Sequence, residues 1–138
     1  MNEVKSFREK HEGKEPFCNL LFPTCPIRNV LDRVGDKWSL LVMYTLQKKS
    51  PLRFKELLLE IPDISERSLS KTLRVLEEDD FVTRSVFNEA PPRVEYALTP
   101  RAKSFYFIVE ELIYWAKENI NEIYVSRGLK IPKPSTDS

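Results

Sequence analysis

Apolar residues recur at helical spacing along most of the chain between residues 17 and 127. Spacings of three and four residues place apolar side chains on one face of a helix. The pattern predicts five helices, each with an apolar stripe. In chain order, the stripes are Ile27, Val30, Leu31 and Val34; Trp38, Leu41, Val42, Thr45 and Leu46; Phe54, Leu57, Leu58 and Ile61; Leu69, Leu73 and Leu76; and apolar residues from Phe105 to Tyr124.

Proline, glycine and residues whose side chains can cap a helix predict where these helices begin and end. Pro26 suits the first turn of the first helix, and Gly35 suits its end. Asp36, Ser65 and Thr99 stand directly before predicted helices, where a side-chain oxygen can cap free backbone amides.

The period changes from 3.6 to 2 between Phe81 and Leu98, in the segments "VTRSVF" and "RVEYAL". Alternation of this kind predicts two strands, and the proline-containing link "NEAPP" between them predicts a hairpin. The resulting order is helix, helix, short extended piece, helix, turn, helix, hairpin, helix. It predicts a mainly α protein with a small β-hairpin (α+β), in which a helix-turn-helix is followed by a two-stranded wing.

We expect one folded domain at residues 17–127, flanked by a flexible segment at 1–16 and a tail at 128–138. The 138-residue chain is long enough to bury a core. It lacks the apolar runs of a secretory signal or a membrane span, so we expect a cytoplasmic protein with reduced thiols and no membrane partner.

Composition argues against an enzyme. Three scattered glycines cannot form a phosphate-binding loop, and His11 is the only histidine. Two cysteines without further histidines leave no zinc quartet, so no metal site or cofactor is expected. The net charge of +1 means that binding to a polyanion must depend on where the charge lies.

The helix within "ISERSLSKTLRVLEEDDFV" has a polar face suited to double-stranded DNA. In a helix-turn-helix the second helix enters the major groove, with its N-terminal residues nearest the bases. The candidate DNA-binding residues are Ser65, Arg67, Ser68, Ser70, Lys71 and Arg74. Arginine and lysine can donate to guanine, and serine can bond to several bases. Alternatively, this face meets an acidic protein partner, or is only solvated.

The wing offers further candidates. Arg84 and Arg93 lie on its strands and Asn88 at its tip, where they can approach a phosphate or the minor groove. For Arg93 an ion pair with Glu89 or Glu95, which would hold the hairpin shape, is an equal alternative.

The last helix is apolar over more of its surface than one core requires, which predicts homodimerisation. The candidate interface residues are Phe105, Ile108, Leu112, Ile113, Trp115 and Ile120. The alternative is that the N-terminal segment folds back over this helix.

Three segments resemble the HxlR-type winged-helix transcriptional regulators, which are related to the MarR group. They are "CPIRNVLDRVGDKWSLLVMYTL", "LRFKELLLEIPDISERSLSKTLRVLEEDDFV" and "PPRVEYALT". The resemblance to the family extends from about Cys25 to Trp115. The resemblance implies a homodimeric activator or repressor that binds a pseudo-palindromic operator. Asp80 and Ala102 depart from it, because the family usually has glycine there; aspartate tolerates the left-handed conformation better than most residues.

Cys25 is a candidate redox switch. It precedes Pro26 at a helix N-terminus, where backbone amides stabilise a thiolate, and Arg28 could assist. The resemblance implies that some relatives sense oxidants or electrophiles through a cysteine at this position, and Cys18 could be its partner thiol. The alternative is a buried structural cysteine.

Overall fold

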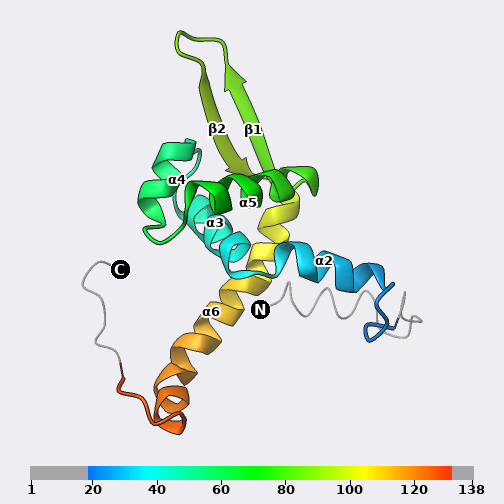
Figure 1. The fold of residues 1–138 in the computed structure, drawn as a ribbon, viewed down its shortest axis with the longest axis vertical. Helices are drawn as coiled ribbons and strands as arrows, with labels where there is room; N and C mark the ends of the chain where they lie inside the picture. Colours follow the sequence, from blue (N-terminus) through cyan, green and yellow to red (C-terminus); the bar gives the residue numbers. More distant parts are fainter. Residues whose placement is uncertain (1–18, 132–138) are drawn as a thin grey trace.

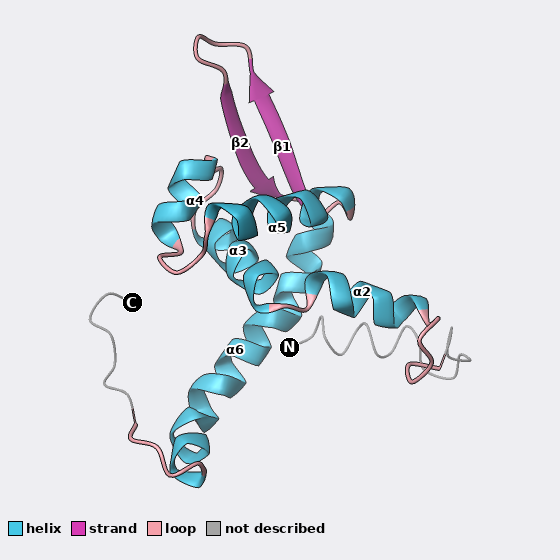
Figure 2. Cartoon of the chain, viewed as in Figure 1, coloured by secondary structure: helices cyan, strands magenta, loops and turns pink. Residues whose placement is uncertain are grey.

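The computed structural model describes residues 19–131, so the predicted flexible segment 1–16 lies outside the described residues. Residues 19–131 form five helices and one hairpin. These elements follow the predicted order (Figures 1 and 2). The elements are α2 (Pro26–Val34), α3 (Lys37–Lys48), α4 (Phe54–Glu60), α5 (Glu66–Glu78), β1 (Val82–Phe87), β2 (Arg93–Leu98) and α6 (Pro100–Ser126). The prediction of a winged helix-turn-helix is confirmed.

The core forms where α3 meets α5, β2 and the first turns of α6. Met43 and Leu46 of α3 are fully buried, as are Leu69 and Leu76 of α5. These residues belong to the apolar stripes predicted for the two helices, apart from Met43. Because its inner stripe is buried here, α5 turns its opposite face toward solvent.

The two strands pair antiparallel from Val82 opposite Leu98 to Phe87 opposite Arg93. Leu52 lies in the short extended piece predicted between the second and third helices. It adds an isolated bridge to Tyr96 through two backbone hydrogen bonds of 2.8 and 3.0 Å. The hairpin projects from the body (Figure 1), so only its base is buried. The apolar residues of β1 are therefore buried at the base of the hairpin and exposed toward its tip.

Two of the three predicted helix caps are confirmed. The Ser65 hydroxyl accepts a hydrogen bond of 3.0 Å from the Ser68 amide. The Thr99 hydroxyl accepts one of 3.1 Å from the Ala102 amide. Asp36 occupies the predicted N-cap position of α3, but its side chain makes no capping hydrogen bond. That part of the prediction is wrong, and the Asp36 carboxylate stays exposed.

Asp80 takes the left-handed backbone conformation, with φ of 62°. The Phe81 amide donates to the Leu76 carbonyl (2.8 Å) and the Asp80 amide to the Glu77 carbonyl (3.1 Å). These two bonds form a Schellman motif, which ends α5 and requires a left-handed residue. Aspartate therefore fills a position usual for glycine, as predicted.

Candidate nucleic-acid interface

The exposed face of α5 is held in place from the inside of the molecule. Leu69, Leu73 and Leu76 are buried in the shared core, and Thr72 on the flank of the helix is also buried. With the capping bond at Ser65, this packing fixes both the rotation and the start of the helix.

The basic side chains on this face are exposed and have no acidic partner within residues 19–131. Arg67, Lys71 and Arg74 are exposed, and none of them makes an ion pair with any residue that the structure describes. Ser65 and Ser70 are also exposed, so five of the six predicted DNA-binding residues share open surface. Such a face has unused hydrogen-bond donors and uncompensated positive charge.

Ser68, the sixth predicted residue, is half-buried. It lies on the flank of α5 that faces α2, where it lines a pocket together with Lys71. The structure therefore brings the six residues together on one helix, with Ser68 at the edge of the exposed face.

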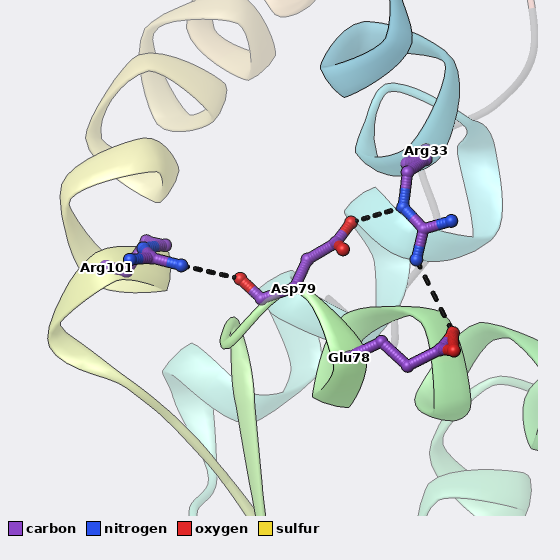
Figure 3. A network of polar contacts seen from close by, with 4 residues as sticks. All are labelled: Arg33, Glu78, Asp79 and Arg101. Atoms are coloured by element: carbon purple, nitrogen blue, oxygen red, sulfur yellow. Dashed lines mark hydrogen bonds and ion pairs between the residues drawn. The ribbon is translucent and has the colours of Figure 1, made fainter.

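Basic residues of α2 and α6 hold the acidic end of α5 (Figure 3). The Arg33 guanidinium lies 2.6 Å from an Asp79 carboxylate oxygen and 3.4 Å from one of Glu78. Arg101 donates to the Asp79 carbonyl oxygen at 2.9 Å. The hydrogen bond to Asp79 raises the pKa of the Arg33 guanidinium above its already high usual value. Two acidic side chains beside the proposed DNA surface are thus paired within the protein.

The three wing candidates differ in their surroundings. Arg84 and Asn88 are exposed on β1 and just beyond it. Arg93 is instead engaged inside the wing, 3.3 Å from Glu89 and 3.6 Å from Glu95, with its guanidinium 4.2 Å from the Phe87 ring centre. These contacts match the structural alternative for Arg93, an ion pair that holds the shape of the hairpin.

The helices α2 and α6 expose apolar surface. Four of the predicted interface residues on α6 are exposed, and the exposed apolar residues of both helices include Ile27, Val30, Leu31, Ile108, Leu112, Trp115 and Ile120. Two other predicted interface residues are half-buried: Phe105 packs edge-on against Phe81 at 5.7 Å, and Ile113 packs against the core. Part of the predicted interface therefore serves the core of its own protomer.

Cys25 is the N-cap residue of α2 and is 2% exposed. It is disulfide-bonded, which differs from the expectation of reduced thiols; Cys18 lies outside the described residues. Arg28 donates a hydrogen bond of 3.2 Å to the Leu21 carbonyl oxygen. The predicted position of Cys25 at a helix N-terminus is confirmed.

Within residues 19–131, no helix is both long enough and apolar enough to cross a bilayer. No group of three or more potential metal ligands occurs there either.

Comparison with known proteins points to one family. Residues 33–124 match the family model described as HxlR-like helix-turn-helix. An HTH-type transcriptional regulator of Methanothermobacter thermautotrophicus is 43% identical over 93 residues, covering 67% of this chain and 70% of that protein. The HTH-type transcriptional regulator YtfH of Escherichia coli is 33% identical over 127 residues, covering 92% and 96%.

Solved structures agree with the sequence matches. A structure of the transcriptional regulator ytfH from Salmonella typhimurium is similar with a TM-score of 0.72 at 33% identity, covering 80% of this chain and 97% of that one. The redox regulator HypR in its reduced form is similar with a TM-score of 0.67 at 33% identity. The match covers 73% of this chain and 99% of that one. Diamide-treated YodB from B. subtilis is similar with a TM-score of 0.59 at 32% identity. The match covers 70% of this chain and 96% of that one.

Proposed function

The chain belongs to the HxlR-like helix-turn-helix family of transcriptional regulators, and from this premise we propose that it binds a pseudo-palindromic DNA operator as a homodimer. In this proposal each protomer inserts α5 into the major groove. The relatives named above are regulators rather than enzymes, and this chain is a regulator of the same family.

One observation carries the DNA contact: the exposed face of α5 has three basic side chains with no ion-pair partner among the described residues, interleaved with serines. Arginine and lysine side chains can donate to guanine N7 and O6, and serine can donate or accept. The acidic residues Glu78 and Asp79 at the other end are held by Arg33, which reduces their repulsion of a duplex.

A second copy of the chain is the proposed occupant of the apolar surface on α2 and α6. Exposed apolar residues on two helices, such as Val30, Leu112 and Trp115, favour burial against a partner. A twofold dimer presents two copies of α5, which a pseudo-palindromic operator would match.

The wing supplies accessory contacts in this proposal. Arg84 and Asn88 are placed to approach a phosphate or the minor groove beside the half-site. Arg93 maintains the shape of the wing through its ion pairs and its contact with Phe87.

Selection of bound fragments from random duplexes, followed by affinity measurement across salt concentrations, tests the function. We expect a two-part consensus with half-site centres about 10 base pairs, or a multiple of that, apart. Affinity should also fall steeply with salt, because phosphate binding releases counterions. The alternative, a winged helix that binds an acidic protein partner, predicts no consensus and no discrete footprint.

We also propose that Cys25 makes operator binding respond to redox state. The supporting observations are its position at the N-terminus of α2 and the similarity to the redox regulator HypR. The proposed change is two-electron oxidation of two thiols to a disulfide, with diamide as the electron acceptor in the experiment.

In the wild-type protein, operator affinity is expected to differ between the diamide-treated and dithiothreitol-treated forms by roughly 5- to 150-fold, the usual range of coupling between two sites. Cys25→Ser should show no difference, because it cannot form the disulfide. Fluorescence anisotropy with a labelled operator measures both. If Cys25→Ser responds to diamide as the wild type does, the proposal is wrong.

A further inference from the structure

A pocket of about 360 Å³ lies between α2, the start of α3 and the flank of α5. Its size falls at the lower end of the range for small-molecule sites in proteins, about 300–1,000 Å³. The pocket includes Ser68 and Lys71 of the proposed DNA surface, but most of its lining comes from residues that the proposed DNA contact does not use.

Two residues with hydroxyl groups line the pocket, and neither hydroxyl has a hydrogen-bond partner among the described residues. Ser39 is 2% exposed and Thr72 is 7% exposed, and both residues line the pocket. Among the described residues, neither hydroxyl makes a hydrogen bond, and neither oxygen is completely sealed from the solvent. Because each oxygen stays open to solvent, each hydroxyl can hydrogen-bond to a polar occupant of the pocket.

Charged groups of both signs also line this pocket. The carboxylates of Asp32 and Asp36 and the ammonium group of Lys71 make no ion pair among residues 19–131. Arg33 also lines the pocket, but its guanidinium is engaged by Asp79 and Glu78. Among the described residues, the unpaired charges of the pocket are therefore one negative group from α2, one from the N-cap of α3, and one positive group from α5.

We propose that this pocket binds a small zwitterion of the amino-acid class. The ligand's ammonium group would meet Asp32 and Asp36, and its carboxylate would meet Lys71. The hydroxyls of Ser39 and Thr72 would complete hydrogen bonds to the polar groups. An anion alone would face two carboxylates, and a cation alone would leave Lys71 unpaired, so a ligand with both charges matches the lining best.

The ligand would also regulate DNA binding, a consequence that rests on the proposed function. A Lys71 ammonium group that pairs with the ligand's carboxylate has its charge neutralised there, so it is less available to a base or a phosphate. Binding of the amino acid should therefore lower operator affinity, and operator should lower affinity for the amino acid by the same factor.

The direct test uses the full-length protein without DNA, titrated with each of the twenty amino acids in isothermal calorimetry. The strongest binder is then compared with the amine that lacks its carboxylate and the acid that lacks its amino group; for phenylalanine these are phenethylamine and 3-phenylpropionate. We expect each counterpart to bind roughly tenfold or more weakly, because each loses a charge-assisted bond. The proposal is overturned if no amino acid binds, or if a counterpart binds equally well.

Substitutions locate the site. Asp36→Asn removes an exposed charge, so the protein should still fold, and we expect it to weaken amino-acid binding roughly tenfold. Glu122→Gln, on the far half of α6, is the matched control and should bind as the wild type does. Unchanged binding by Asp36→Asn would place the ligand elsewhere and overturn the proposal. Operator binding without amino acid tests the proposed function separately, since the pocket can bind its ligand even if no operator exists.

Discussion

Leu112→Glu is expected to yield a monomer and to weaken operator binding by about 10²- to 10⁴-fold, the range typical of losing a linked second contact. Leu112 is 55% exposed on α6, within the apolar surface proposed to meet a second copy. A glutamate buried there without a partner carries a large desolvation cost. A single protomer could then place only one copy of α5 on the operator.

The measurement combines light scattering, for the molar mass in solution, with operator titration. Leu59→Glu is the matched control, because Leu59 is 81% exposed on α4, away from α2 and α6. It introduces the same charge and should leave the dimer intact. A dimeric Leu112→Glu protein with wild-type operator affinity would contradict the proposed interface.

The sequence predicted the helices, the hairpin and their order because these depend on local spacing and local capping. The stripe formed by Leu69, Leu73 and Leu76 fixed the buried side of α5, and hence the side left to Arg67 and Lys71. The predicted N-cap at Ser65 followed from residue type alone. The same stripe and cap also predict where the six candidate DNA-binding residues lie, and their contact with DNA stays a prediction.

Contacts between distant segments could not be predicted in the same way. Arg33 and Asp79 are 46 positions apart, and nothing in their local sequence specifies that they pair. Asp36 shows the complementary error: its residue type suited a cap, but no capping hydrogen bond forms. The pocket beside α5 also arises only when α2, α3 and α5 are assembled.

The pairing of Arg33 also bears on how the candidate sites are connected. The helix α2 begins next to Cys25 and carries Arg33 in its last turn. Arg33 in turn holds the C-terminal end of α5 through Asp79 and Glu78 (Figure 3). A nine-residue helix thus links the cysteine directly to the proposed DNA-binding helix. Redox state and the proposed ligand would both act on α5 from this side.

Arg67→Ala is expected to weaken operator binding by ~1–3 kcal/mol, about 5- to 150-fold, if Arg67 reads a base. Arg67 lies in the first turn of α5, is exposed and has no ion-pair partner among the described residues. Its removal should leave stability nearly unchanged, since an exposed side chain without partners contributes little to folding. Lys71→Ala should act in the same direction.

Competition titrations with the selected operator and with random duplex separate base contacts from phosphate contacts. Loss of a base contact lowers affinity for the operator more than for random DNA, whereas loss of a phosphate contact weakens both alike. Arg127→Ala removes the same charge just beyond the C-terminal end of α6, far from α5 (Figure 1), and should leave the operator affinity near that of the wild type. If Arg67→Ala and Lys71→Ala both bind operator as the wild type does, α5 does not lie in the major groove, because its unpaired cations would then have no contact to lose.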